Sequence, residues 1–384
     1  MANVFLTPPT VYTGEGALQM SKGTLAGMGK KALVVTDQTM IQFGNLKKLT
    51  DILDELGKEY VVYAEINGEP SDVMIENGAA LYQKEGCDFL LAMGGGSPMD
   101  AMKAIGAVVT LGQDINSFYG KTIEGEMPPS LVIPTTAGTG SEATQFTIIN
   151  NTKQNIKMLL KGPSLMPKTA VIDPMFTMTA PPSVTASTGI DALCHAVEAY
   201  TSKKAFPMAD TMALSAVKRI FQNLLTCYQD GKNVAARTEM ATAALEAGMA
   251  FNNSSVTIIH GMSRPIGALF HVPHGLSNAM LMVKCLRFAL PGCPDRFCTL
   301  AKTIGVYQDG MTDQQGAEAF LLAVAQLCSQ LNIQTPAQFG IAKEEFFAQI
   351  PKMAKDAEDS GSPGNTRRTP SQEEMQAIYR SLYE

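Results

Sequence analysis

The sequence predicts an α/β domain followed by an all-helical domain, and three observations support this division. The chain has 384 residues, more than the roughly 250–300 at which a single hydrophobic core stops growing. Short β-branched runs alternate with helical patterns in the first half, whereas Ala, Leu, Met and Glu recur at helical spacing from residue 182 onward. The stretch "APPS" (180–183) adds two prolines and a helix N-cap candidate, Ser183. We therefore expect domains at residues 1–181 and 182–384.

The predicted elements of the first domain follow a βαβαβ order. Strands are expected in "KKALVVTDQTM" (30–40), "YVVYAEI" (60–66) and "FLLAMGGGS" (89–97), and helices in 46–60, 72–88 and 98–110. Strand-like runs occur again in 128–144 and 169–176 and then stop. Because alternating strands and helices form crossover units, we expect a parallel sheet with right-handed connections.

Composition excludes several classes of partner and location. The net charge is −6, and no run of Lys or Arg exceeds a pair, so neither nucleic acid nor an anionic membrane is an expected partner. No apolar run approaches the ~18 residues of a membrane span, and no signal peptide is recognisable. The seven cysteines are scattered without CxxC spacing, which favours a reducing, cytoplasmic setting. We expect a small-molecule partner.

A glycine-rich turn stands between the third strand and its helix. Gly94, Gly95 and Gly96 are followed by Ser97 as N-cap candidate and Pro98 as the expected first helical residue. Glycines allow close approach of a phosphate, and the N–H groups at a helix start attract negative charge. The spacing is not the GxGxxG of the common dinucleotide fold, and a tight turn that binds nothing is the alternative interpretation.

Two further segments offer polar groups for a nucleotide. The loop "IPTTAGTGSEAT" (133–144) contains Thr135, Thr136 and Thr139, whose hydroxyls either hold ribose or phosphate oxygens or stabilise the loop locally. Asp37, at the end of the first clear strand, either accepts from ribose hydroxyls or caps the following helix.

Histidine spacing predicts a metal site. Asp191 and His195 are four residues apart and lie on one face of a helix; alone, they are typical of a capping aspartate and a buried histidine. The other three of the four histidines, His260, His271 and His274, crowd into residues 258–280. One Asp with His195, His260 and His274 suits Fe²⁺, Zn²⁺, Ni²⁺ or Co²⁺, and a catalytic ion would need a further open position.

Four motifs together resemble the iron-containing (group III) alcohol dehydrogenase family: "GGGSPMDAMKAIG", "IPTTAGTGSEAT", "TGIDALCHAVEAY" and "HGMSRPIGALFHVPHGLSNAM". The resemblance covers nearly the whole chain. It implies an NAD(P)-binding α/β domain and a helical metal-binding domain, with Asp191, His195, His260 and His274 as ligands. It places cofactor contacts at Asp37, Gly95, Gly96, Ser97, Thr135, Thr136, Thr139 and Lys157, and Gly94, Asp100 and Thr144 complete the predicted cofactor-binding set. The expected cofactors are NAD(H) and Fe²⁺, with Zn²⁺ or another divalent metal as alternative, in a homodimer or higher homo-oligomer.

One position departs from the family pattern. Many members have a histidine one turn after the first histidine of "HGMSRP", thought to relay a proton, where this chain has Arg264. Arginine stays charged and cannot do so, so His271 is the alternative candidate. The charge of Arg264 needs an anion, supplied by a cofactor phosphate, by a nearby Glu, or by a substrate that carries a carboxylate or sulfonate.

The expected activity is hydride transfer between NAD(H) and a small primary alcohol or its aldehyde, with the metal as Lewis acid. An aldehyde that carries a carboxylate or sulfonate is included among the expected substrates. Arg264 and His271 are the candidate catalytic side chains. A glycerol dehydrogenase-like polyol oxidoreductase and a catalytically silent metal-binding scaffold are the alternative hypotheses.

Overall fold

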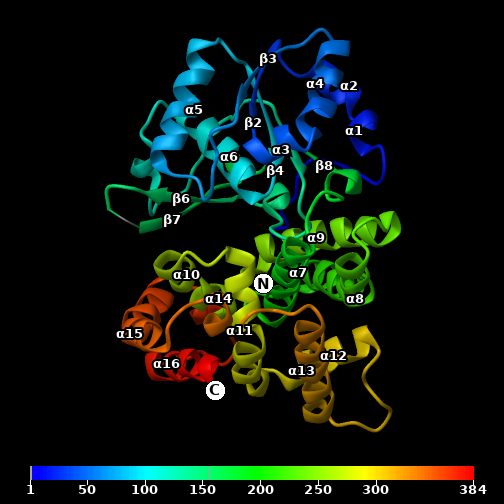
Figure 1. Ribbon diagram of the computed structural model, residues 1–384, viewed down its shortest axis with the longest axis vertical. Coiled ribbons are helices and arrows are strands. Elements are labelled where there is room, and N and C mark those ends of the chain that lie inside the picture. The colour runs from blue at the N-terminus through cyan, green and yellow to red at the C-terminus, as the bar shows by residue number, and fades with distance from the viewer. Residues whose placement is uncertain (1, 155) are drawn as a thin grey trace. The chain divides into compact units, whose positions relative to one another are not determined.

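A computed structural model describes residues 2–154 and 156–384 and divides them into two compact units (Figure 1). The sheet unit contains Leu6–Thr136 and Gly140–Ala180. The helical unit contains residues 2–5, Ala137–Thr139 and Pro181–Glu384. A single division of the chain at residue 181 does not represent the two short segments from the first half that belong to the helical unit.

The sheet unit is built on a parallel sheet, as the sequence predicts. Among the described residues its six strands stand in the order β1 (Thr10–Thr13), β8 (Thr169–Ile172), β5 (Ser130–Pro134), β4 (Phe89–Gly94), β2 (Lys31–Val35) and β3 (Glu59–Tyr63), all parallel. Every residue of β4 and β5 is buried, because helices cover both faces of a parallel sheet and leave no face for water. β3 and β4 lie on opposite sides of β2, so the strand order reverses there.

Where the sheet unit is described, six α-helices connect these strands: α1 (Ala17–Met20), α2 (Lys22–Gly27), α3 (Gln38–Gln42), α4 (Asn45–Glu55), α5 (Asp72–Lys84) and α6 (Gly96–Leu111). In Figure 1, α2 and α4 lie on one side of the sheet and α5 on the other. Leu25 of α2 and Leu49 of α4 pack with Val34 and Leu91 of the sheet in one apolar cluster.

Besides the edge strand β1, which was not among the predicted strands, two details of this unit differ from the expectation. The helix after the glycine turn begins at Gly96 with Gly95 as N-cap, so Ser97 lies in its first turn and is not the cap. Gly95 is extended (φ −73°, ψ −160°), and a helix that begins there tolerates Pro98 as its third residue, where no intrahelical N–H bond is lost. The second difference is an antiparallel pair, β6 (Phe146–Asn151) with β7 (Ile156–Lys161), which the sequence analysis did not predict.

The helical unit, within its described residues, has ten α-helices: α7 (Pro182–Thr201), α8 (Pro207–Gln229), α9 (Val234–Ser254), α10 (Ile258–Phe270), α11 (His274–Ala289), α12 (Pro294–Ile304), α13 (Asp313–Gln330), α14 (Pro336–Phe339), α15 (Lys343–Asp359) and α16 (Gln372–Arg380). The unit is helical, as expected. Ser183 does not cap α7, because the helix begins one residue earlier, at Pro182, whose ring presets the helical φ angle.

Helix α7 lies at the centre of the helical unit, where it packs against α8, α9 and α11. All residues from Gly189 to Thr201 are buried. A helix that is buried on all sides must satisfy its polar side chains inside the protein. Asp191, His195 and Glu198 of α7 therefore need partners from neighbouring helices.

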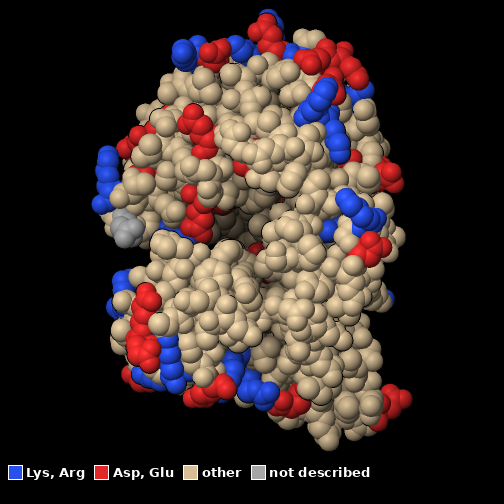
Figure 2. All heavy atoms as spheres, viewed as in Figure 1, with Lys and Arg blue, Asp and Glu red and all other residues tan. Residues whose placement is uncertain are grey.

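The visible surface carries both signs of charge. On the face that Figure 2 shows, Lys and Arg side chains are interspersed with Asp and Glu and form no continuous basic area. In the part of the chain that the structure describes, no helix combines the length and apolar character that crossing a membrane requires.

Candidate functional site

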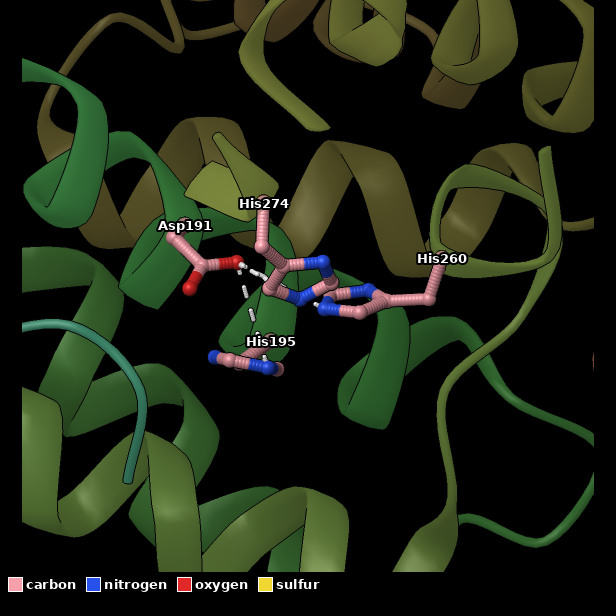
Figure 3. A group of neighbouring side chains, drawn as sticks. All are labelled: Asp191, His195, His260 and His274. Carbon is pink, nitrogen blue, oxygen red and sulfur yellow. Dashed lines mark ion pairs between the residues drawn. The ribbon is translucent and has the colours of Figure 1, made fainter. Parts of the chain in front are cut away.

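Four side chains from three helices converge in the helical unit, and we call them the ligand group: Asp191 and His195 of α7, His260 of α10 and His274 of α11 (Figure 3). One ligand atom from each lies within 4.8 Å of all the others. Asp191 Oδ1 is 3.6 Å from His260 Nε2, 3.8 Å from His274 Nε2 and 4.0 Å from His195 Nε2. Tetrahedral ligands at about 2.0–2.2 Å from an ion lie roughly 3.3–3.6 Å apart. The donor set and its spacing therefore fit one divalent cation after small adjustments.

A sharp turn between α10 and α11 brings two of these histidines together. α10 ends at Phe270, and His271 takes a left-handed conformation (φ 54°) as its C-cap. Pro273 precedes α11, which begins with His274 as its first residue. Helix termination by a left-handed residue reverses the chain within a few residues, so the side chains of His260 and His274 meet although fourteen positions separate them.

The ligand group is strongly coupled electrostatically. Burial raises the pKa of Asp191, but the neighbouring histidines outweigh burial and bring this pKa below its ordinary value. Burial lowers the pKa of His195 to about 3. For His260, burial also lowers the pKa, but the carboxylates of Glu198 and Asp191 outweigh it and raise the pKa to about 9. Cation binding requires neutral imidazoles beside the anionic carboxylate, so a cation that binds here displaces the proton that the two carboxylates favour on His260.

Glu198 contacts the ring nitrogen of His260 that faces away from the ligand group. It was not among the expected site residues. Its Oε2 contacts His260 Nδ1. Its Oε1 accepts from the hydroxyl of Thr257 at 2.8 Å and from the Ile259 N–H at 2.6 Å. This arrangement keeps the proton of His260 on Nδ1 and directs Nε2 to the ligand group. The sequence contained a signal, because Glu198 continues the helix face of Asp191 and His195 at the next turn.

Asn278 is a second residue that the sequence analysis missed. It lies one turn after His274 on α11, and its side-chain nitrogen is 2.7 Å from Asp191 Oδ1. The same nitrogen lies 3.1 Å from His260 Nε2 and 3.2 Å from His274 Nε2. The signal was the i, i+4 spacing from a candidate ligand.

The two candidate catalytic residues have other contacts. Arg264 Nη1 donates to Ser362 Oγ at 3.0 Å. Burial lowers the pKa of Arg264, and the charge of Glu198 acts in the opposite direction. Glu198 is thus one source of negative charge that acts on Arg264, and an anion from the cofactor or the substrate stays a prediction. His271 is exposed and lies outside the ligand group; its relay role stays a prediction.

Three predicted cofactor-binding segments meet at the carboxyl ends of neighbouring strands in the sheet unit. Asp37 follows β2, Gly94 ends β4 with Gly95 and Gly96 after it, and Thr135 and Thr136 follow β5. This edge includes the point where strand order reverses, the usual ligand position in open parallel sheets. The first N–H groups of α6 have no acceptor within the helix, and the helix dipole makes them attractive to phosphate.

The turn itself requires glycine at position 94. Its φ of 151° is one that other residues avoid, and an added Cβ would lie 2.6 Å from Pro98 Cγ and 3.1 Å from Asp37 Oδ2. Asp37 caps α3 by accepting from the Met40 N–H at 3.1 Å through Oδ1, so the capping interpretation holds. Among the described residues, the buried hydroxyl of Thr136 has no hydrogen-bond partner. A cradle of this kind fits a dinucleotide phosphate.

Several other predicted cofactor residues have protein partners. Asp100 accepts from the Ser141 hydroxyl at 2.5 Å and from the Ile148 N–H at 3.0 Å. Thr144 accepts from the buried ammonium of Lys103 at 3.1 Å, and Lys157 pairs with Glu69 at 2.6 Å. Asp100 and Thr144 thus hold the loop from inside, and their contact with the cofactor stays a prediction. Thr139 belongs to the segment that groups with the helical unit.

Comparison with known proteins identifies the family. A family model described as iron-containing alcohol dehydrogenase matches residues 8–174, and one described as the C-terminal part of the Fe-containing alcohol dehydrogenase family matches residues 185–383. The chain is 35% identical to 1,3-propanediol dehydrogenase of Citrobacter freundii, covering 99% of this chain and 98% of that one. It is 33% identical to NAD-dependent methanol dehydrogenase of Bacillus methanolicus over 100% of both chains. A crystal structure of 1,3-propanediol oxidoreductase matches with a TM-score of 0.96 at 33% identity and 100% coverage of both. The chain therefore belongs to the iron-containing alcohol dehydrogenase family of oxidoreductases.

Proposed function

We propose that this protein interconverts a small primary alcohol and its aldehyde, with NAD(H) as redox cofactor and one divalent cation, Fe²⁺ by expectation, at the ligand group. The single observation that carries the proposal is the convergence of one carboxylate oxygen and three imidazole nitrogens within 4.8 Å. Relatives named for methanol and for 1,3-propanediol act on small alcohols with primary hydroxyl groups. One of them is named NAD-dependent, which supports the choice of cofactor.

In this proposal Asp191, His195, His260 and His274 hold the cation, and mixed nitrogen and oxygen donors without thiolate suit iron or zinc. When bound, the cation supplies Lewis-acid stabilisation of charge on the substrate oxygen, and the nicotinamide supplies the redox chemistry. His274, whose side chain is 35% exposed, is the most accessible of the four. We infer that the substrate oxygen approaches on its side of the group.

The residues of the sheet unit bind the cofactor in this proposal. The N–H groups at the start of α6 receive the pyrophosphate, and Gly94 to Gly96 permit its close approach. The hydroxyl of Thr136, which lacks a partner among the described residues, donates to the same region. Asp37, beside Gly94, accepts from ribose hydroxyls.

The experiment that tests the proposal is an assay with controlled metal content. The protein is stripped with a chelator, reloaded with Fe²⁺ or Zn²⁺, and NADH oxidation is followed with propanal. Turnover that depends on the added cation supports the proposal. A glycerol dehydrogenase-like enzyme would instead prefer dihydroxyacetone with NADH, or glycerol with NAD⁺. A protein that binds the cation but turns over none of these substrates would be a silent scaffold.

Arg264 bears on the choice between uncharged and acidic aldehydes. Its contacts with Ser362 and the charge of Glu198 favour a structural role. We therefore expect Arg264→Gln to lower kcat/KM for propanal and for succinic semialdehyde by similar factors. A bidentate contact with a substrate carboxylate would instead produce a selective loss of about ten- to a hundredfold on the acidic aldehyde. Parallel kinetics with both aldehydes decide between these outcomes.

Asp37 bears on the choice between NAD and NADP. A carboxylate repels the 2′-phosphate of NADP. We expect Asp37→Gly to raise kcat/KM for NADPH relative to NADH by about tenfold. A change of this size corresponds to roughly the free energy of one charge-assisted hydrogen bond. Asp37→Asn is the companion variant, because asparagine caps a helix as well as aspartate does but lacks the charge. Unchanged cofactor preference in both variants would exclude Asp37 from the ribose site.

We further propose a cytoplasmic homo-oligomer. All seven cysteines are free, which supports a reducing compartment. Sedimentation velocity of the purified chain tests the association state.

A further inference from the structure

Lys103 is a buried lysine of α6 that the proposed chemistry does not use. The residue is 3% exposed, and lysine is almost never buried to this extent unless its ammonium group is paired. The side-chain nitrogen donates to Ser141 Oγ at 2.9 Å, to Thr144 Oγ1 at 3.1 Å and to the Phe146 carbonyl at 2.9 Å. An ammonium group has three N–H donors, so these three acceptors use all of them.

Asp100, one turn before Lys103 on α6, completes the network on the other side of Ser141. Its Oδ1 accepts from the Ser141 hydroxyl at 2.5 Å, and its Oδ2 accepts from the Ile148 N–H at 3.0 Å. Asp100 Oδ1 lies 3.8 Å from Lys103 Nζ, so the two charges offset each other. Burial lowers the pKa of Lys103 to about 8, whereas the charges of Asp100 and Glu142 act in the opposite direction. Lys103 is therefore a cation near neutral pH, and its saturated network defines one arrangement of the groups around it.

The hydroxyl partners of Lys103 belong to the returning part of the polar loop 133–144. The outgoing part continues from β5, which pairs with β4. There the Thr136 hydroxyl lies near the glycine turn, since a Cβ added at Gly95 would be 3.7 Å from its oxygen. Thr136 and residues 140–146 belong to the sheet unit. The two ends of the loop are thus held separately, one by β4 and the other by the side chains of α6.

We propose that Lys103 is a positioning residue of the cofactor site, because its ammonium group holds the returning part of the polar loop against α6. This inference rests on the proposed binding of NAD(H). The first N–H groups of the same helix receive the pyrophosphate in that proposal, so Lys103 keeps the loop and the phosphate-binding turn in one arrangement. A loop that is ordered before the cofactor arrives lowers the entropy cost of binding. Without Lys103 the cofactor must order the loop itself, and its affinity falls.

The test is the dissociation constant of NADH for Lys103→Met, measured by the fluorescence of bound NADH in the metal-loaded protein. Methionine is flexible enough to fill the space of the lysine chain, but it has no ammonium group. We expect the constant to rise about tenfold, roughly the cost of ordering two loop side chains. In the assay with propanal, KM for NADH should rise by a similar factor, while kcat and the affinity for Zn²⁺ stay near the wild-type values. A residue that only stabilises the fold would lower Tm without separating KM from kcat in this way.

Ser141→Ala is the second variant, and it decides the question if Lys103→Met does not fold. It removes only the hydroxyl that joins Lys103 to Asp100 and leaves both charges in place. We expect a smaller loss of NADH affinity in the same direction, because two of the three acceptors of Lys103 remain.

Lys58→Met is the matched control. The ammonium group of Lys58 also makes three hydrogen bonds, to the carbonyls of Ala26, Met28 and Gly29. Lys58 directly precedes β3 and so lies at the amino ends of the strands, opposite the edge where the cofactor-binding segments meet. This variant should lose stability but keep the wild-type affinity for NADH.

Two results would overturn the inference. Wild-type affinity for NADH in the deciding variant would mean that the network of Lys103 only supports the fold. An equal loss of affinity in Lys58→Met would mean that the sheet unit is loosened in general. A wild type that does not bind NADH would instead overturn the proposed cofactor site itself.

Discussion

Replacing His260 with alanine removes both metal binding and turnover while the helical unit stays folded. His260 is the ligand with the most complete support, because Glu198 holds its Nδ1 and its Nε2 lies 3.6 Å from Asp191 Oδ1. A Lewis acid contributes several kcal/mol to stabilisation of charge in the transition state, so kcat/KM falls by about three orders of magnitude or more. Metal content by elemental analysis and NADH oxidation with propanal measure the two losses.

The fold should survive this change because the ligands lie on α7, α10 and α11, which pack through a large apolar core. The cost is roughly 1–3 kcal/mol, since Glu198 loses a buried partner. His271→Asn is the control for metal content, because asparagine tolerates the left-handed conformation of this position and the residue lies outside the ligand group. Normal metal content in His260→Ala would remove that residue from the ligand set.

Replacing Glu198 with glutamine should weaken metal affinity about 10- to 100-fold without removing any ligand. The carboxylate uses one oxygen for His260 Nδ1 and the other for Thr257 and the Ile259 N–H. Glutamine has only one accepting oxygen. Either His260 Nδ1, or Thr257 together with the Ile259 N–H, therefore loses its acceptor. The loss of negative charge also makes Nε2 a weaker donor to the cation. Titration with Zn²⁺ against a chelator measures the change in affinity.

Glu246→Gln is the matched control for this prediction. Glu246 is another largely buried glutamate of the helical unit, paired with Arg219 at 3.2 Å and with Ser215 at 3.0 Å. Its replacement costs stability through a lost ion pair but leaves the ligand group untouched. If both variants lost metal affinity to the same extent, the effect would come from general loosening of the helices, and Glu198 would have no specific role.

Local patterns determined much of the architecture. The apolar runs that form β2 and β4 are buried throughout or nearly so, and such runs between helical patterns indicate a parallel sheet without knowledge of any contact. The pairing of Asp191 with His195 follows from helical periodicity alone. The other two ligands could be predicted because histidine is rare in this chain. Only four histidines are present, and three of them fall in the ligand group.

Features that depend on the neighbours of a residue were decided only by the tertiary structure. The β6–β7 pair was missed because two short strands are recognisable mainly through their mutual pairing. The start of α6 at Gly96 depends on the conformation of the glycine turn, which composition does not specify.

The contacts of Arg264 show the same limit at the site. The position of Arg264 one turn after His260 indicates a positive charge near the ligand group. Its partner Ser362, however, lies 98 residues further along the chain, and Glu198 is on another helix. Periodicity describes which face of a helix a residue occupies, whereas helix packing decides what meets that face. For this reason the sequence by itself determined the fold class and the four candidate ligands, and only the packing of α7, α10 and α11 revealed that Glu198 and Asn278 hold those ligands in place.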